Sequence, residues 1–328
     1  MTQKSPVFIF GAPRSGTSLL RRIINSHPEI GIPPESLIYS SLYDWRNYYG
    51  DLSVQENREK LIRNILELKA IQKWDVVPEE SRILEKYQNP TFHGAVSALI
   101  ESWAELHNKP RWGEKTPWHG FYWRAIHEGF PSAQFIHLVR DGRDAALSWK
   151  RARFGPNHIY PLALSWAEYL NEISKLEQRL DKVYFYEIHY EDLLKFPQDT
   201  VKKLCNFLGI DFQNDMFRYH TKELQSEQTD IRNERNLSRP IMERNFNKWK
   251  SQLSLREIRI FEAVAGNVLE RYGYKLRLDN PRMSDPEKVI IKYLEHPFKR
   301  LFSLIKNTDG YYEAFKLWRI RIRLMITG

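Results

Sequence analysis

The sequence has little cysteine and no long apolar segment, and both absences limit what the protein can be. Its one cysteine, Cys205, allows neither an intramolecular disulfide framework nor a thiolate metal cluster. Apolar neighbours at helical spacing predict that Cys205 is a small buried side chain rather than a nucleophile. No stretch approaches the ~18–20 apolar residues that cross a membrane, and no secretory leader opens the chain. We therefore expect the protein to fold in the reducing cytoplasm.

Positive charge is in excess, but it is unevenly distributed. The 328 residues carry a net charge of +9, which suits an acidic ligand or an anionic surface. Residues 286–328 contain nine Lys and Arg against four Asp and Glu, so more than half of the excess lies in this last segment. The overall charge therefore says little about a functional site in the rest of the chain.

Three passages of strand, turn and helix predict a parallel α/β sheet. The strands, each with the helix that follows it, are Val7–Phe10 with Thr17–Asn25, Gln134–Val139 with Asp144–Lys150, and Val183–His189 with Gln198–Leu208. In the first helix the apolar residues share one face, and Arg21 and Arg22 are expected to face solvent. Further helices are expected at about 53–72, 92–107, 160–180 and 254–272. We predict a three-layer fold of the P-loop type, with helices on both sides of a central sheet.

The pattern changes near residue 279, and we predict a main domain over residues 1–278 and a basic C-terminal extension over 279–328. Basic and apolar residues alternate over Trp318–Leu324, which favours a strand packed on the main body. The alternative is a basic amphipathic segment that touches an anionic membrane surface. Upstream, the polar stretch Gln225–Arg239 is typical of a long loop, either a connection or a lid.

The loop Gly11–Ser18 lies between a strand and a helix N-terminus, where free backbone N–H groups and the helix dipole attract anions. Compared with the triphosphate loop G-x-x-x-x-G-K-[ST], the two glycines and Ser18 are in register, but Thr17 replaces the lysine and Arg14 is added. That lysine normally reaches β- and γ-phosphates that a Mg²⁺ bridges. Its absence argues against triphosphate chemistry, and Arg14 can supply positive charge to a shorter anionic group without a metal.

Two motifs in the right order resemble those of a known family. Phe8–Ser18 is similar to the 5′-phosphosulfate loop of sulfotransferases that use 3′-phosphoadenosine-5′-phosphosulfate (PAPS), and Ile136–Ser148 is similar to their 3′-phosphate motif. The resemblance extends over about residues 5–275 and looks closer to the tyrosylprotein and bacterial branch than to the small-phenol branch. It implies that the loop binds the 5′ end of the nucleotide through Arg14, Ser15, Gly16, Thr17 and Ser18. It also implies that Arg140 and Ser148 bind the 3′-phosphate.

The resemblance further implies a catalytic set. Glu35 stands where this branch has its general base, and Lys115 matches a lysine that stabilises the bridging oxygen. Arg14 adds charge at the transferring group. Glu114 and His119 remain alternative candidates for the base.

Other polar residues have weaker assignments. Tyr190 is expected either near the adenine or in the core, and Arg239 belongs to a late segment that returns to the nucleotide in family members. Arg143, at the start of a helix, is more typical of a surface charge, and His137, inside an apolar strand, of a core histidine.

Together with the resemblance, these observations predict transfer of a sulfuryl group from PAPS to a hydroxyl or amine. The reaction is expected to need no metal and to release adenosine 3′,5′-bisphosphate (PAP). Two alternatives stay open: a P-loop kinase for a small metabolite, and a catalytically idle nucleotide-binding or membrane-surface protein. Nucleic acid is not expected as a partner. The sequence does not distinguish a small molecule, a glycan, a lipid or a peptide as acceptor, and it leaves the oligomeric state open.

Overall fold

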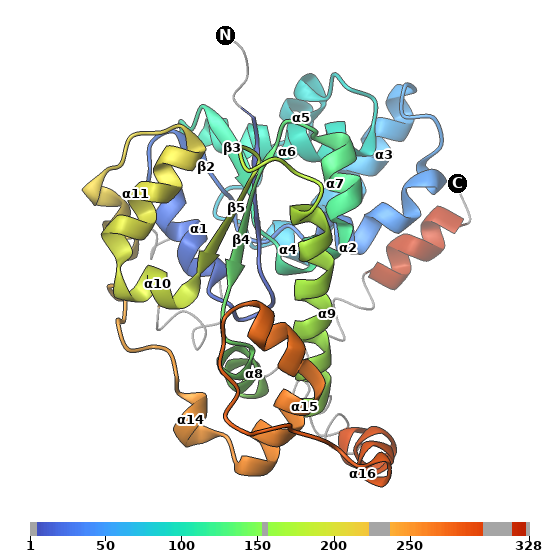
Figure 1. Ribbon diagram of the computed structural model, residues 1–328. Helices are drawn as coiled ribbons and strands as arrows, with labels where there is room; N and C mark the ends of the chain where they lie inside the picture. The colour runs from blue at the N-terminus through green and yellow to red at the C-terminus, as the bar shows by residue number, and fades with distance from the viewer. Residues whose placement is uncertain (1–4, 153–156, 223–236, 298–316, 326–328) are drawn as a thin grey trace.

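Five parallel strands form the centre of the protein, as a computed structural model shows (Figure 1). The structure describes residues 5–152, 157–222, 237–297 and 317–325. The strands lie in the order β2-β3-β1-β4-β5. Their bounds are β1 Val7–Phe10, β2 Ile30–Gly31, β3 Arg111–Glu114, β4 Gln134–Val139 and β5 Phe185–His189. The chain builds the sheet to one side of β1 and then crosses to the other side, so the direction reverses between β1 and β4.

Helices surround this sheet. In the first half of the chain they are α1 (Thr17–Asn25), α2 (Ile38–Leu42), η1 (Tyr43–Tyr49), α3 (Gln55–Leu66), α4 (Lys69–Gln72), α5 (Glu80–Lys86), α6 (Phe92–Leu106), η2 (Pro117–Tyr122), α7 (Trp123–Gly129) and α8 (Gly142–Lys150). In the second half they are α9 (Ile159–Glu177), α10 (Tyr190–Lys195), α11 (Pro197–Leu208), η3 (Asn214–Arg218), α12 (Tyr219–Lys222), α14 (Trp249–Gln252), α15 (Leu255–Arg271), α16 (Asp285–Ile290) and η4 (Ile291–Glu295). None of the helices described is both long and apolar enough to cross a bilayer.

Alternate residues of the central strands supply two hydrophobic cores, one on each face of the sheet. In β1, Phe8 and Phe10 join the core that α6, α9 and α15 cover, whereas Val7 and Ile9 join the core beneath α1 and α11. Because both faces are buried, β1 is a continuous apolar run and β4 is apolar except at Gln134 and His137, which made both strands recognisable in the sequence. The predicted central parallel sheet flanked by helices is confirmed.

Several predicted elements have the expected bounds, and others were missed. β1, β4 and α1 match, and α15 begins at the expected place, with a capping box between Ser254 and Glu257. β2 and β3 were not predicted. β3 begins with Arg111, which is buried because its guanidinium donates to the carbonyls of Ser5 and Leu208, and this polar start conceals the strand.

The end of the chain is helical where it is described, so the expectation of a strand over Trp318–Leu324 was wrong. Residues 317–325 form a helix that buries Ile320 and Leu324 against the larger core. Residues four positions apart share one face of a helix, as Ile320 and Leu324 do. The apolar pattern over residues 318–324 therefore fits a helix as well as a strand. The division at residue 278 stays a prediction. Most of the predicted loop over 225–239 lies outside the described residues.

Candidate active site

A cavity of about 680 Å³ lies at the carboxyl ends of the strands. Each strand leads into a residue that lines it: Arg14 after β1, Glu35 after β2, Lys115 after β3, Arg140 after β4 and Tyr190 after β5. Ligands of open α/β sheets bind at this edge, at the point where the strand order reverses. The topology therefore brings together predicted residues that are far apart in the sequence.

The loop after β1 holds an unusual backbone conformation. Arg14 and Gly16 have φ angles of 71° and 100°, in the region that disfavours side chains. A side chain at Gly16 would place its Cβ 2.5 Å from the ring of Tyr190, so this position requires glycine. Gly16 has no side chain to cap α1, which leaves N–H groups of the first turn for a ligand, and Thr17 and Ser18 line the cavity. Ser15 is buried outside the lining, and its hydroxyl has no partner among the described residues.

Lys115 connects this loop to Glu35. Its Nζ lies 2.6 Å from Oε1 of Glu35 and 3.2 Å from Oγ of Ser18. The Lys115 side chain is 3% exposed, whereas that of Glu35 is 40% exposed. A fixed, buried cation thus stands between an anion-binding loop and a carboxylate that solvent or a second substrate can reach.

The two alternative bases, Glu114 and His119, are buried and do not line the cavity. Glu114 accepts hydrogen bonds from the hydroxyls of Ser36 and Thr116, at 2.9 and 2.6 Å. Burial raises the pKa of Glu114, but His119 and the two hydroxyls outweigh burial and lower it. His119 has Nδ1 3.1 Å from Glu114 and accepts the Tyr39 N–H at Nε2. Of the three candidates, Glu35 is therefore the one placed to meet a substrate.

Arg140 and Ser148 contact the loop from the other side. The Arg140 guanidinium donates to the carbonyl of Arg14 at 3.0 Å and to that of Asn245 at 3.1 Å, and it lies 4.4 Å from the centre of the Tyr190 ring. Ser148 accepts a hydrogen bond from Nε of Arg14 at 3.2 Å. The two sequence motifs therefore form one continuous basic surface, with the Tyr190 ring between Gly16 and Arg140.

Some positions differ from expectation. Arg21 and Arg22 are not on the solvent face: both are buried and line the cavity, and Arg21 donates to the carbonyl of Ile32 at 2.9 Å. Arg239 is exposed outside the lining, and its carbonyl accepts from the Tyr219 hydroxyl. Asn245, which lines the cavity and contacts Arg140 and Tyr190, was missed because nothing in its polar segment marks it.

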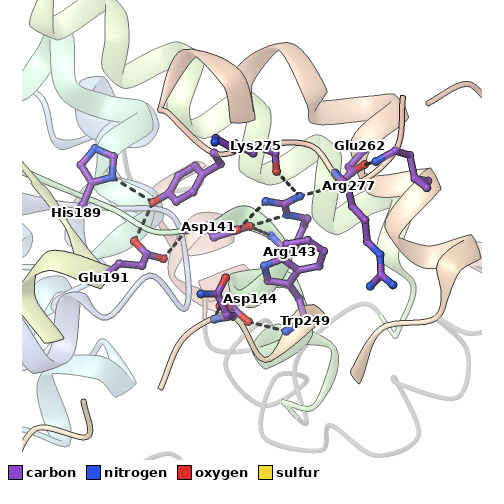
Figure 2. Close-up of polar contacts among 12 residues, drawn as sticks. Asp141, Arg143, Asp144, His189, Glu191, Trp249, Glu262, Lys275 and Arg277 are labelled. Atoms are coloured by element: carbon purple, nitrogen blue, oxygen red, sulfur yellow. Dashed lines mark hydrogen bonds and ion pairs between the residues drawn. The ribbon is translucent and has the colours of Figure 1, made fainter. Parts of the chain in front are cut away.

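Arg143 is not a surface charge either (Figure 2). It is 2% exposed and lies between Asp141, at 2.8 Å, and Glu262 of α15, at 2.6 Å. Its guanidinium also lies 3.7 Å from the centre of the Trp249 ring. This buried pairing fixes the start of α8, the helix that carries Ser148, against α15.

Two acidic residues near Arg143 hold the backbone of neighbouring segments in place (Figure 2). Asp144 accepts the N–H groups of Asn247 and Trp249, which holds the segment after Asn245 against α8. Burial raises the pKa of Asp144. Glu191 accepts the Asp141 N–H at 3.1 Å and the hydroxyl of Tyr274 at 3.0 Å. Both carboxylates therefore position backbone next to Arg140.

Within the described residues, no cluster of three His, Cys, Asp or Glu side chains could hold a metal. Independence of metal stays a prediction.

Comparison with known proteins identifies the family. The model of the Sulfotransferase family matches residues 6–214, more than half of the chain. The chain belongs to the sulfotransferase family. Among curated members, it is 23% identical over 223 residues to a putative protein-tyrosine sulfotransferase of Caenorhabditis briggsae, covering 65% of this chain and 69% of that protein. It is 22% identical over 304 residues to protein-tyrosine sulfotransferase A of Caenorhabditis elegans, covering 89% and 73%.

Solved sulfotransferases share the fold of this family member. The sulfotransferase domain from the curacin biosynthetic pathway has a TM-score of 0.56 and 22% identity, covering 83% of this chain and 98% of that domain. The sulfotransferase domain of the Synechococcus PCC 7002 olefin synthase has a TM-score of 0.55 and 24% identity, covering 84% and 98%. The resemblance found in the sequence is confirmed, and it speaks against the kinase alternative.

Proposed function

We propose that this sulfotransferase moves a sulfuryl group from PAPS to a hydroxyl or amine of an acceptor. The observation that carries the proposal is the position of Lys115 between Ser18 of the anion-binding loop and the accessible carboxylate of Glu35. A transfer reaction needs a general base, a cation near the transferred group, and alignment of the donor with the acceptor. Glu35, Lys115 and the loop after β1, which we propose for these three tasks, line the same cavity.

Glu35 is the proposed general base. It takes the proton of the acceptor hydroxyl while the acceptor oxygen forms a bond to sulfur. The bond between sulfur and the 5′-phosphate oxygen breaks, and its electron pair leaves with PAP. Lys115 and Arg14 offset the negative charge that grows on that bridging oxygen. No metal takes part in this proposal.

The remaining contacts fit a nucleotide with charge at both ends. The loop over residues 14–18 offers backbone N–H groups and hydroxyls to the 5′ end, and Arg140 and Ser148 offer a cation and a hydroxyl to the 3′-phosphate. Tyr190 supplies an aromatic surface between them. Arg239 is left out of the proposed set because it is exposed and does not line the cavity.

The acceptor is proposed as a molecule that carries a hydroxyl or an amine. Relatives carry names such as protein-tyrosine sulfotransferase and, in Mycobacterium bovis, omega-hydroxy-beta-dihydromenaquinone-9 sulfotransferase Stf3, so acceptors among the relatives differ widely. We propose a small molecule, a glycan or a lipid rather than nucleic acid. A cytoplasmic location, with or without peripheral contact to a membrane, is part of the same proposal.

Titration calorimetry with PAP, with and without Mg²⁺, tests the donor. We expect PAP to bind equally in both conditions. Arg140→Ala should weaken PAP about 10- to 100-fold, the cost of a charged hydrogen-bonding partner, while weakening adenosine 5′-monophosphate by less than about threefold.

Three outcomes count against the proposal. Equal weakening of the two nucleotides would show that Arg140 does not contact the 3′-phosphate. Binding of ATP that depends on Mg²⁺, without binding of PAP, would favour a kinase. Binding of PAP without transfer from labelled PAPS to any fraction of a cell extract would favour the idle protein.

A further inference from the structure

One wall of the catalytic cavity is a single layer of side chains. Leu37 and Ala70 line the large cavity, and they also line a second, apolar cavity of about 40 Å³. The second cavity is also lined by Leu317 and Ile320, from the helix over residues 317–325. These four residues therefore form two layers with a gap between them.

The helix is fixed in this place by polar and apolar contacts. Ile320 and Leu324 are 1% and 0% exposed. The Arg321 guanidinium donates to the carbonyl of Ser41 at 3.3 Å, and Arg323 pairs with Glu67 at 2.7 Å. Figure 1 shows this helix in red, beside the elements drawn in blue. Its position is thus set by the segments that flank the wall.

The wall belongs to the acceptor side of the cavity. Leu37 follows the proposed base Glu35 by two residues, and Trp74, just after α4, donates to the carbonyl of Glu35 at 3.4 Å. A base must lie within hydrogen-bond reach of the hydroxyl that it deprotonates. The body of an acceptor held at Glu35 consequently lies near Leu37 and Ala70.

The backbone at Leu37 also needs support. Its φ angle is 54°, a left-handed conformation that is strained for a leucine and persists where surrounding packing fixes it. Leu317 and Ile320 line the same small cavity as Leu37. The second layer can therefore influence both the position of Leu37 and the depth of the pocket in front of it.

We propose that helix 317–325 forms the outer layer of the acceptor wall, and that Ile320 limits the length of the apolar group that the acceptor site admits. The term acceptor rests on the proposed sulfotransferase function, whereas the two-layer wall does not. The C-terminal segment thus acts on specificity, in addition to adding basic charge.

The test compares Ile320→Ala with Leu324→Ala. Both substitutions shorten a buried side chain of the same helix, but Ile320 lines the second cavity and Leu324 does not. The probes are 4-alkylphenols from methyl to hexyl, which combine a hydroxyl with a graded apolar tail. Their affinity is measured by calorimetry with PAP present, and without PAP if PAP does not bind.

In Ile320→Ala we expect the preferred tail to lengthen by one or two carbons, with about fourfold tighter binding for each added methylene that is buried. Leu324→Ala should keep the wild-type preference. PAP affinity should be unchanged in both variants. The same length preference in all three proteins would overturn the proposal.

A second measurement needs neither donor nor acceptor. Crystals of the two variants are pressurised with xenon, which occupies apolar cavities. In Ile320→Ala we expect xenon behind Leu37, in a space joined to the catalytic cavity; in Leu324→Ala we expect that space to keep its wild-type size. An intact wall with no enlarged cavity in Ile320→Ala would contradict the proposal even if sulfuryl transfer is established. If PAP does not bind, the proposed function is contradicted, but the xenon experiment still tests the two-layer wall.

Discussion

Lys115 and Glu35 form an ion pair, but their surroundings suit the two residues to different roles. Lys115 is buried behind Ser18 and has little freedom to move, whereas Glu35 presents its carboxylate at the cavity surface. Substitution of Glu35 should therefore affect the acceptor and leave the nucleotide in place.

We predict that Glu35→Gln lowers the rate of sulfuryl transfer by about 10²- to 10⁴-fold, the usual contribution of a general base. PAP affinity should change by less than about threefold, because the amide keeps the size of the side chain. Transfer from labelled PAPS and calorimetry with PAP measure the two effects separately. A fully active variant would mean that Glu114 or His119 is the general base, and either residue would first have to break its present contacts.

At the residue scale, the sequence indicated which residues follow the strands, and it predicted the burial of Cys205 and His137 correctly but not that of three arginines. Apart from Ser15, the predicted loop residues line one cavity together with Arg140, Ser148, Glu35 and Lys115, since motifs record which residues lie near the end of each strand. Arg143 was misjudged because its partner Glu262 lies 119 residues away, and no local pattern reveals such a pairing. The same holds for Arg21 and Arg22, which appear polar on a helical wheel although tertiary packing covers them.

Among the helices, α8 connects the proposed nucleotide site to the rest of the fold. It starts directly after Arg140, carries Ser148, and is held at its first turn by the pair between Arg143 and Glu262. Glu262 also accepts the backbone N–H groups of Arg277 and Leu278. One carboxylate thus joins α8, α15 and the segment that follows α15.

We predict that Glu262→Ala lowers the free energy of unfolding by about 3–5 kcal/mol, because it leaves a buried guanidinium short of a partner. The matched control is Arg259→Ala on the same helix, which removes a partly exposed pair with Glu287 and should cost about 1 kcal/mol or less. Urea unfolding measures both. Similar losses in the two variants would mean that the pair of Arg143 and Glu262 contributes little.

Prediction of elements succeeded where local pattern and packing agree. β1 and β4 are apolar because both faces are buried, and α15 has its start fixed by Ser254. β2 is two residues long and β3 begins with an arginine, so neither gives a strand pattern. Over residues 317–325 a pattern was present but ambiguous. A short alternation of apolar residues fits both a strand and a helix, and packing against the core favours the helix.

At the scale of the whole molecule, Glu295 attaches η4 to the main body. Glu295 accepts hydrogen bonds from Arg256 of α15 and from His158, just before α9. Its bond from Arg256 outweighs burial and lowers the pKa of Glu295 from 4.5 to about 2. A lowered pKa stabilises the fold above the unfolded value of 4.5, and this contribution disappears as the pH falls towards 2.

We therefore predict that Glu295→Gln melts below the wild type by about 2 °C at pH 7, as suits a screened pair of about 1 kcal/mol in a domain of this size. The difference should stay constant down to about pH 5 and shrink below it. The difference in melting temperature is measured by thermal unfolding of both proteins between pH 7 and pH 3.5. A gap that widens in acid would contradict the assigned sign.

The ring of Tyr190 has a consequence for which nucleotides the protein can distinguish. It lies between Gly16, where a Cβ would approach it within 2.5 Å, and Arg140, whose guanidinium lies 4.4 Å from the ring centre. The ring thus separates Gly16 from the Arg140 guanidinium, while Arg140 also donates directly to the carbonyl of Arg14 in the same loop. On the proposed assignment, these contacts fix the distance between the groups that bind the two charged ends of the nucleotide. An isomer that carries its second phosphate on the 2′ oxygen would present the same charges at the wrong spacing.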